Sequence, residues 1–273
     1  MTSNTSLDGS ADYSLEAGFA YPEQSVRVER AEQKRLHACC EIEPEVFGDV
    51  ADPGLVGRRP TVMVAETIAA CMPGWGQVLT VHRLTQMRPI KLDETLTLNG
   101  RVDGLTPHPR GQVLKTSWRY IDAEGDVVFE VQPEGLIIDP NYTPGSAERP
   151  EKPVVVERAY ENALVKTCTP EATMAYCEGT HNPIHFDPVH AREFGFRAPI
   201  LAGTHTMSFL MEPLYRRYSP RTFTLALGFK RPAFWDDVLT VQATSAEGYF
   251  DYLRAVNADN KCVADCRIEN LRE

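Results

Sequence analysis

Apolar and polar residues alternate with a period of two in eight stretches of the chain, four in each half. Side chains that alternate in this way point to opposite faces of a strand, so the pattern predicts half-buried strands. The predicted strands lie near residues 78–87, 95–103, 113–121, 127–138, 222–230, 238–245, 249–256 and 263–271. Turn sequences such as Glu124-Gly125-Asp126 separate neighbouring strands, which favours antiparallel pairing.

Helices are predicted ahead of the strands in both halves. A short strand and a helix are expected over 26–40 and again over 165–178, and a longer helix over 61–71 and 204–217. In the last of these, apolar residues recur at helical spacing: Met207, Leu210, Met211 and Leu214. We therefore predict an α+β fold in which an antiparallel sheet wraps around a buried helix, and this unit occurs twice.

A direct repeat in the sequence supports the duplication. Residues 84–98 read LTQMRPIKLDETLTL and residues 227–241 read LGFKRPAFWDDVLTV, with six identical positions at a constant offset of 143. Residues 139–153 are rich in proline and are predicted to link the copies. The expected organisation is a flexible arm over 1–20, a first repeat over 21–138, the linker, and a second repeat over 154–273.

Composition narrows the classes of function. The chain has 273 residues, with 38 acidic and 28 basic side chains and a formal charge of −10, which disfavours a nucleic-acid partner. Residues 1–16 are polar and acidic, so no signal peptide is expected, and no apolar run approaches the length of a membrane span. We expect a cytoplasmic protein.

The cysteines do not predict a metal site. There are seven, and they form no Cys-x-x-Cys pair. Cys262, Ala264, Cys266 and Ile268 alternate along a predicted strand and are expected to share one face. The cysteines are interpreted as small core residues in a reducing compartment, and no metal or redox cofactor is expected.

Candidate chemistry is concentrated in residues 176–205. Tyr176 begins the stretch YCEGTHNPIHFD. Asn182 in this stretch precedes a proline, and a residue before proline disfavours helical geometry. His185 is therefore expected in an irregular connection. The stretch GFRAPILAG follows and enters the long helix at Gly203. The N–H groups at the start of a helix are free and lie at its positive end, so they suit an oxygen that gains negative charge.

The two stretches together resemble the MaoC-like (R)-specific enoyl-CoA hydratases. Asn-Pro-Ile-His-x-Asp followed by Gly-Phe-x-x-Pro-Ile-x-x-Gly carries the resemblance. With two copies and the motif in the second, the chain is similar to the double-hotdog form of that family, in which two tandem hotdog repeats each wrap a sheet around a helix. The resemblance covers about 160–271 by sequence and about 20–138 by architecture only.

The resemblance implies a function and a site. In such enzymes water adds across a trans-2-enoyl thioester of CoA or an acyl carrier protein, and no cofactor takes part. His185 is then the acid and base, Gly203 N–H the oxyanion donor, and Asn182 orients the water or holds the loop. Thr204 and Arg231 are expected to help bind the substrate, although Arg231 recurs as Arg88 in the first copy and equally fits a structural corner. A homodimer is also implied.

One position departs from the family. The catalytic Asp stands five residues before the His, and here that residue is Thr180. Three hypotheses remain open. His185 works alone or with Glu178 or His181 in a hydratase or dehydratase; the site performs other thioester chemistry, such as hydrolysis, isomerisation or cyclisation; or the protein only binds acyl thioesters. The first hypothesis is favoured, because both the Asn-Pro-Ile-His motif and Gly203 are present. No Asn-Pro-x-His follows His37 in the first copy, which is expected to shape the acyl pocket.

Overall fold

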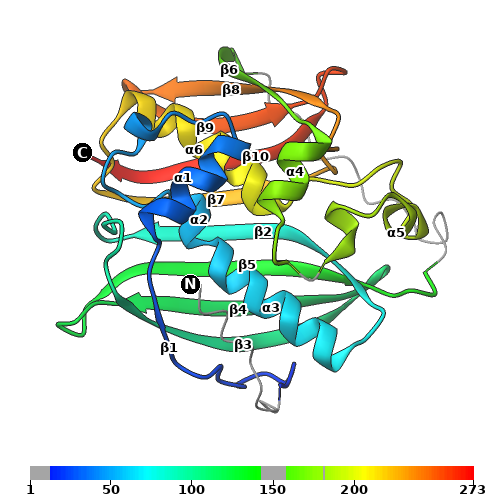
Figure 1. Ribbon diagram of the computed structural model, residues 1–273. Helices are drawn as coiled ribbons and strands as arrows, with labels where there is room; N and C mark the ends of the chain where they lie inside the picture. The colour runs from blue at the N-terminus through cyan, green and yellow to red at the C-terminus, as the bar shows by residue number, and fades with distance from the viewer. Residues whose placement is uncertain (1–12, 143–157, 181) are drawn as a thin grey trace.

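The chain forms one ten-stranded antiparallel sheet in the computed structural model, which describes residues 13–142, 158–180 and 182–273 (Figure 1). The strand order is β1-β3-β4-β5-β2-β7-β10-β9-β8-β6. The strands are β1 (Gln24–Val26), β2 (Gly76–Gln86), β3 (Leu96–His108), β4 (Gly111–Ile121), β5 (Val127–Ile138), β6 (Glu161–Thr167), β7 (Thr222–Phe229), β8 (Val238–Ala246), β9 (Tyr249–Val256) and β10 (Cys262–Arg272).

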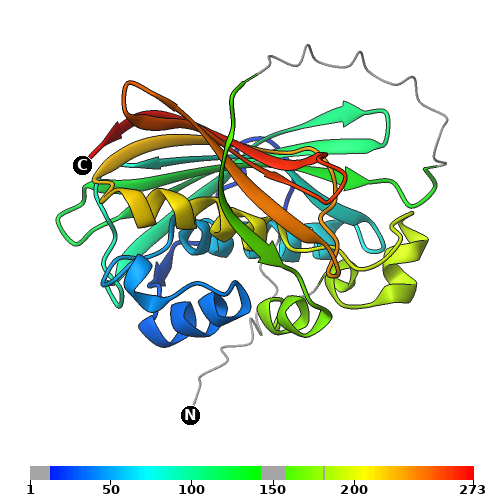
Figure 2. The same cartoon turned by 90° about the horizontal axis from the view of Figure 1, so that it is seen from above.

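The helices gather on one side of this sheet (Figure 2). They are α1 (Arg30–Cys39), α2 (Pro53–Val56), α3 (Arg58–Cys71), α4 (Pro170–Tyr176), α5 (Pro188–Glu193) and α6 (Gly203–Arg217), with 3-10 turns η1 (Pro44–Val46) and η2 (Pro183–His185). In the part of the chain that the structure describes, none of them has both the length and the apolar character needed to cross a bilayer.

The element order of the first half repeats in the second. Each half supplies a short strand, a helix, a long helix and four further strands, as the sequence repeat predicts. All eight predicted main strands are present, and α3 begins three residues before the predicted start of that helix because the turn after α2 runs directly into it.

The predicted linker lies outside the described residues from 143 onward, as does the predicted arm up to residue 12. Gly18, in the described part of the arm, donates its N–H to Val102 O at 2.8 Å.

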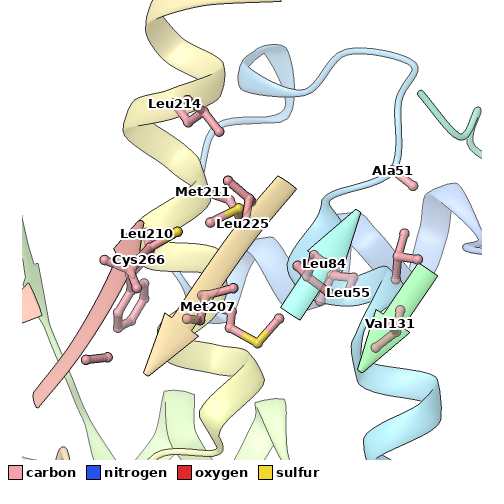
Figure 3. Packing of buried hydrophobic residues seen from close by; sticks show 14 of the residues in the cluster. Ala51, Leu55, Leu84, Val131, Met207, Leu210, Met211, Leu214, Leu225 and Cys266 are labelled. Atoms are coloured by element: carbon pink, nitrogen blue, oxygen red, sulfur yellow. The ribbon is translucent and has the colours of Figure 1, made fainter. Parts of the chain in front are cut away.

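The two halves join through the antiparallel pair β2–β7 at the centre of the sheet. Leu84 faces Leu225 across this seam, and both side chains are fully buried. Met207 and Met211 of α6 pack in the same layer (Figure 3). The β2–β7 seam therefore gives the repeats one continuous core, where burial of each large apolar side chain stabilises the fold by roughly 1.5–3 kcal/mol.

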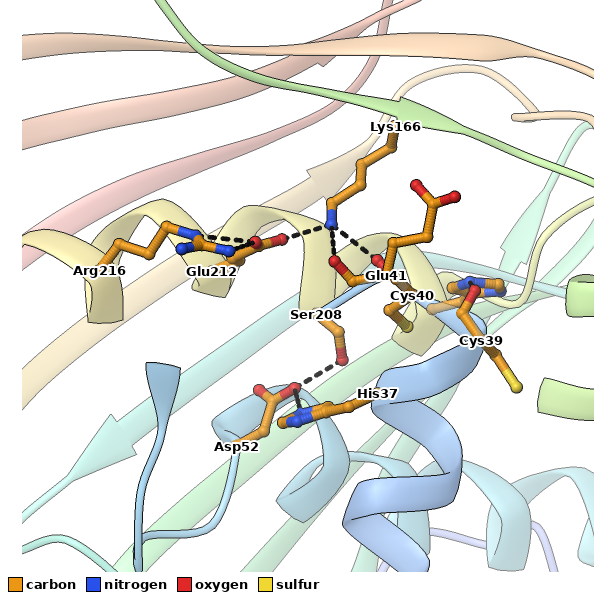
Figure 4. Close-up of polar contacts among 10 residues, drawn as sticks. His37, Cys39, Cys40, Glu41, Asp52, Lys166, Ser208, Glu212 and Arg216 are labelled. Atoms are coloured by element: carbon orange, nitrogen blue, oxygen red, sulfur yellow. Dashed lines mark hydrogen bonds and ion pairs between the residues drawn. The ribbon is translucent and has the colours of Figure 1, made fainter. Parts of the chain in front are cut away.

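Polar side chains also connect the halves beneath the seam (Figure 4). Asp52, in the first half, accepts hydrogen bonds from Ser208 Oγ at 2.7 Å and from the N–H of Gly54 at 2.8 Å, and it lies 3.1 Å from His37 Nε2. A second cluster centres on Lys166, whose ammonium lies 2.6 Å from the Glu212 carboxylate and donates to two backbone carbonyls at the end of α1. Both clusters are buried, so they fix the relative position of α1 and α6.

The cysteines partly follow the prediction. Ala264, Cys266 and Ile268 are buried along β10, but an irregularity in the β9–β10 pairing separates Cys262 from this alternation and leaves it half-buried. All seven cysteines are free thiols. Cys71 is exposed, so its interpretation as a core residue is wrong.

Replacement of Lys166 tests the buried ion pair. Lys166→Met leaves the buried Glu212 carboxylate paired only with Arg216, at 2.8 Å, and removes the donor to the carbonyls of Cys40 and Glu41, so we expect the free energy of unfolding to fall by about 2 kcal/mol. Urea denaturation measures this change. The matched control is Lys261→Met, which removes an exposed pair with Asp259 and should cost less than about 1 kcal/mol. Equal losses in the two variants would contradict the role of the buried pair.

Candidate functional site

A cavity of about 240 Å³ lies where the two repeats meet. Its walls come from α3 and the start of β2 in the first repeat, and from the connections around α4, α6 and β7 in the second. All six candidate residues line it: Thr180, Asn182, His185, Gly203, Thr204 and Arg231. Folding thus brings together residues that are up to 51 positions apart in the sequence (231 − 180).

His185 is held in a defined orientation by the backbone. It ends η2, and its Nδ1 lies 2.9 Å from the carbonyl oxygen of Ile200. A carbonyl accepts only from an N–H, so Nδ1 carries the hydrogen and Nε2 keeps a free lone pair. Burial lowers the pKa of His185 to about 4, although the Ile200 carbonyl acts in the opposite direction. The ring is therefore neutral at pH 7, with Nε2 able to accept a proton.

Asn182 ties the second repeat to the first. Its side-chain Nδ2 donates to the backbone oxygen of Gln77 in β2 at 3.3 Å. Of the two roles expected for Asn182, this contact favours holding the loop. The pairing of β2 with β7 is what brings Gln77 within reach.

Gly203 opens the long helix against the cavity. The N–H groups of Gly203 and Thr204 have no acceptor among the residues that the structure describes, because they belong to the first turn of α6 and have no helical carbonyl one turn earlier. A Cβ atom on Gly203 would lie 2.8 Å from Cδ2 of Leu79. Glycine therefore lets β2 approach the helix start, and the two free N–H groups remain available to a developing oxyanion.

Thr180 has its hydroxyl hydrogen already engaged. Oγ1 donates to the carbonyl of Cys177 at 2.8 Å, in a turn that passes through Gly179 at φ +76°. The Thr180 oxygen can still accept a hydrogen bond. Glu178 does not replace the missing carboxylate: it is exposed, lies 3.5 Å from Arg35 and is not part of the cavity wall. The hypothesis that Glu178 assists His185 is therefore wrong, and His181 lies outside the described residues.

The first repeat contributes charged residues that the sequence analysis missed. Arg58, Glu66 and Arg110 all line the cavity, and Glu66 is its one carboxylate among the described residues. These residues lie outside the motif and more than 65 positions before it, so no local signal connects them with it. On the other side, Arg231 is exposed and donates to the carbonyl of Cys262 at 2.9 Å, which supports the structural part of its expected role.

Comparison with known proteins agrees with this geometry. Residues 151–255 match the family model described as "MaoC like domain". The second half of the chain carries a MaoC-like domain. A relative, 3-hydroxyacyl-thioester dehydratase X of Mycobacterium tuberculosis, is 24% identical to the chain over 178 residues. That match covers 64% of this chain and 62% of the relative's length.

Solved structures establish the fold around this MaoC-like domain. The crystal structure of HtdX from M. tuberculosis superposes with a TM-score of 0.76 at 19% identity, covering 92% of this chain and 98% of that one. A second M. tuberculosis protein, described as having a double hotdog fold, gives a TM-score of 0.61 at 16% identity, covering 94% and 96%. The predicted double hotdog is thereby confirmed.

The low pKa of His185 predicts a pH-dependent stability. The unfolded chain protonates this ring near its ordinary pKa of 6.5, whereas the folded protein does so only near 4. The unfolded state therefore binds more protons in this window, and stability falls as the pH drops from about 6.5 towards 4. We expect His185→Gln to lose less stability than the unaltered protein between pH 7 and pH 5 in urea denaturation.

His82 and His205 also have lowered pKa values, about 3 each, because of burial, and they remain in both proteins. The difference between the two pH profiles therefore isolates His185. Parallel profiles would show that His185 titrates normally in the folded protein.

Proposed function

We propose that the protein is a hydro-lyase that adds water to 2-enoyl thioesters, or removes it from 3-hydroxyacyl thioesters, of CoA or an acyl carrier protein. One observation carries this proposal: a neutral His185 with a free Nε2 and the unpaired N–H groups of Gly203 and Thr204 line the same cavity. The reaction needs a group that accepts and returns a proton, for which we propose His185, and donors that stabilise an oxyanion, for which we propose the two N–H groups. The similarity to a 3-hydroxyacyl-thioester dehydratase supports it.

In the hydration direction, His185 Nε2 takes a proton from water as the water oxygen bonds to C3. The C2=C3 electron pair moves towards the thioester carbonyl, whose oxygen gains negative charge opposite the N–H groups at the start of α6. The protonated ring then returns its proton to C2, which completes the addition of water. A ring with a pKa of about 4 gives up this proton readily. Dehydration is the same sequence in reverse.

Because residue 180 is a threonine, the proposed reaction lacks the carboxylate that the resembled family has at this position. Its hydroxyl oxygen can accept the second hydrogen of the attacking water, but it cannot take a proton at neutral pH. Loss of a general base typically lowers a rate by about 10²–10⁴. The oxyanion donors, each worth about 10²–10³, are retained. We propose a slow hydratase whose proton transfers depend on His185.

We infer that the first repeat shapes the acyl pocket and carries no reaction centre of its own. His37, 143 positions before Thr180, faces Asp52 in the buried cluster and does not line the cavity. We further infer a homodimer in the cytoplasm; seven free thiols agree with a reducing compartment.

The decisive experiment follows labelled water into the product. The protein is incubated with crotonyl-CoA and with a longer trans-2-enoyl-CoA in H₂¹⁸O, and the products are identified by mass spectrometry. We expect a 3-hydroxyacyl thioester that carries one ¹⁸O. His185→Ala should lower its rate of formation by about 10²–10⁴.

His190→Ala is the matched control, because His190 lies on α5, contacts Glu193 at 3.5 Å and is not part of the cavity wall. It should retain the activity of the unaltered protein. Labelled free acid would identify a thioesterase, and an effect of His185→Ala below about tenfold would refute its role.

Restoring the carboxylate tests the interpretation of Thr180. We expect Thr180→Asp to raise kcat/KM for hydration by about tenfold or more, since a carboxylate accepts a proton that the hydroxyl cannot. Thr180→Asn is the control of equal shape that lacks a base, and it should give no gain. A fall in hydration with Thr180→Asp would mean that the threonine serves different chemistry.

A further inference from the structure

The cavity has cationic side chains on both sides of the proposed reaction centre. Lys230 and Arg231 are exposed on the second-repeat side, next to Val263 at the start of β10. Arg110 lines the first-repeat side and is only partly exposed. Lys230 lies 3.3 Å from the Asp265 carboxylate and Arg231 donates to the carbonyl of Cys262, whereas the Arg110 side chain has no such partner among the described residues.

Arg110 is an unusual residue to find in the wall of an acyl pocket. It lies in the hairpin between β3 and β4, where its carbonyl accepts from the N–H of Asp139 at 3.0 Å. Its Nε is buried and has no acceptor within the described ranges, and its guanidinium lies 5.6 Å from the ring of Tyr142. The Arg110 side chain borders the cavity and makes no hydrogen bond or ion pair with any residue that the structure describes, so its guanidinium is available to an acceptor on a ligand.

Strand register places Arg110 at a distance from the reaction centre. Asn182 binds Gln77 in β2, Gln77 pairs with Ile137 in β5, and Ile137 pairs with Gln112 in β4. Neighbouring strands lie about 4.7–4.9 Å apart, so Gln112 is about 10 Å from Gln77 across the sheet. Arg110 comes two residues before Gln112. A group bound by Arg110 therefore belongs to the far part of a medium-length chain.

Glu66, on α3, adds a hydrogen-bond acceptor to the wall of the same cavity as the Arg110 donor. The face of α3 that borders the cavity carries Thr61, Val62 and Ala65, which are small and leave room for a chain, and it ends at Glu66. The Glu66 carboxylate makes no hydrogen bond or ion pair with any residue that the structure describes, and this includes Arg110. An acceptor and a donor thus border one cavity without satisfying each other.

We propose that this end of the cavity is a subsite for a hydroxylated acyl tail. The inference rests on the proposed function and names the substrate class of the same site. A hydroxyl oxygen accepts from Arg110 while its hydrogen is donated to Glu66, so one neutral group meets both needs. An alkyl tail leaves both side chains without a ligand partner, and a carboxylate tail pairs with Arg110 but meets the like charge of Glu66.

The test compares tails of equal length on a carrier without phosphates. The substrates are N-acetylcysteamine thioesters of trans-2-octenoic and trans-2-decenoic acids that end in a methyl, a hydroxyl or a carboxylate group. With the unaltered protein we expect the hydroxyl tail to have the higher kcat/KM, by about tenfold over the methyl tail at the better chain length. Arg110→Met should reduce this preference to about twofold or less.

Two further variants make the result specific. Glu66→Leu should reduce the hydroxyl preference in the same way, and it probes the subsite independently if Arg110→Met fails to fold. Arg119→Met is the matched control: Arg119 lies on β4, pairs with Glu130 at 3.1 Å and is absent from the cavity wall, so the preference should persist.

Three results would overturn the subsite: a methyl tail used as well as the hydroxyl tail, a carboxylate tail used best, or a preference unchanged by both Arg110→Met and Glu66→Leu. A loss in Arg110→Met that is equal for all tails and occurs only with CoA thioesters would assign Arg110 to the carrier phosphates instead. If the unaltered protein hydrates none of the substrates, including crotonyl-CoA, the proposed function itself fails. Selectivity and activity are therefore judged separately.

Discussion

The antiparallel pairing of β2 with β7 is the constraint on which the rest of the structure depends. It converts two sheets into one, buries Leu84 against Leu225, and holds Gln77 where Asn182 can bind it. Without this seam neither repeat has a closed cavity, because the walls come from both. In this chain the two repeats together supply the residues that line the cavity.

The two repeats have diverged in what their polar residues do. In the second, His185 lines the cavity and leaves one ring nitrogen free. In the first, His37 lies in a buried cluster with Asp52, which also binds Ser208 of α6. Buried polar groups must find partners, and here they find them across the repeats. The proposed reaction centre thus lies in the second repeat, and the first contributes polar contacts that hold the helices together.

Replacement of the family's carboxylate by Thr180 changes the balance of the proposed site. The hydroxyl binds back to Cys177, so the loop is closed by a local contact and presents only an acceptor to the cavity. Glu178, next but one in sequence, points to Arg35 and solvent. In the proposed mechanism proton transfer therefore falls to His185, whose low pKa makes it a weak base and a strong acid. Charge stabilisation at the start of α6 is unaffected by the substitution.

The sequence by itself determined the repeated α+β pattern, all eight main strands, and the six candidate residues that line the cavity. Those features depend on local periodicity and on one contiguous motif. Tertiary structure decided that Glu178 leaves the site, and that Arg110 and Glu66 border it from the other repeat. The reason is physical: which side chains meet across a seam depends on strand register and helix packing, and neither is encoded within a single local segment.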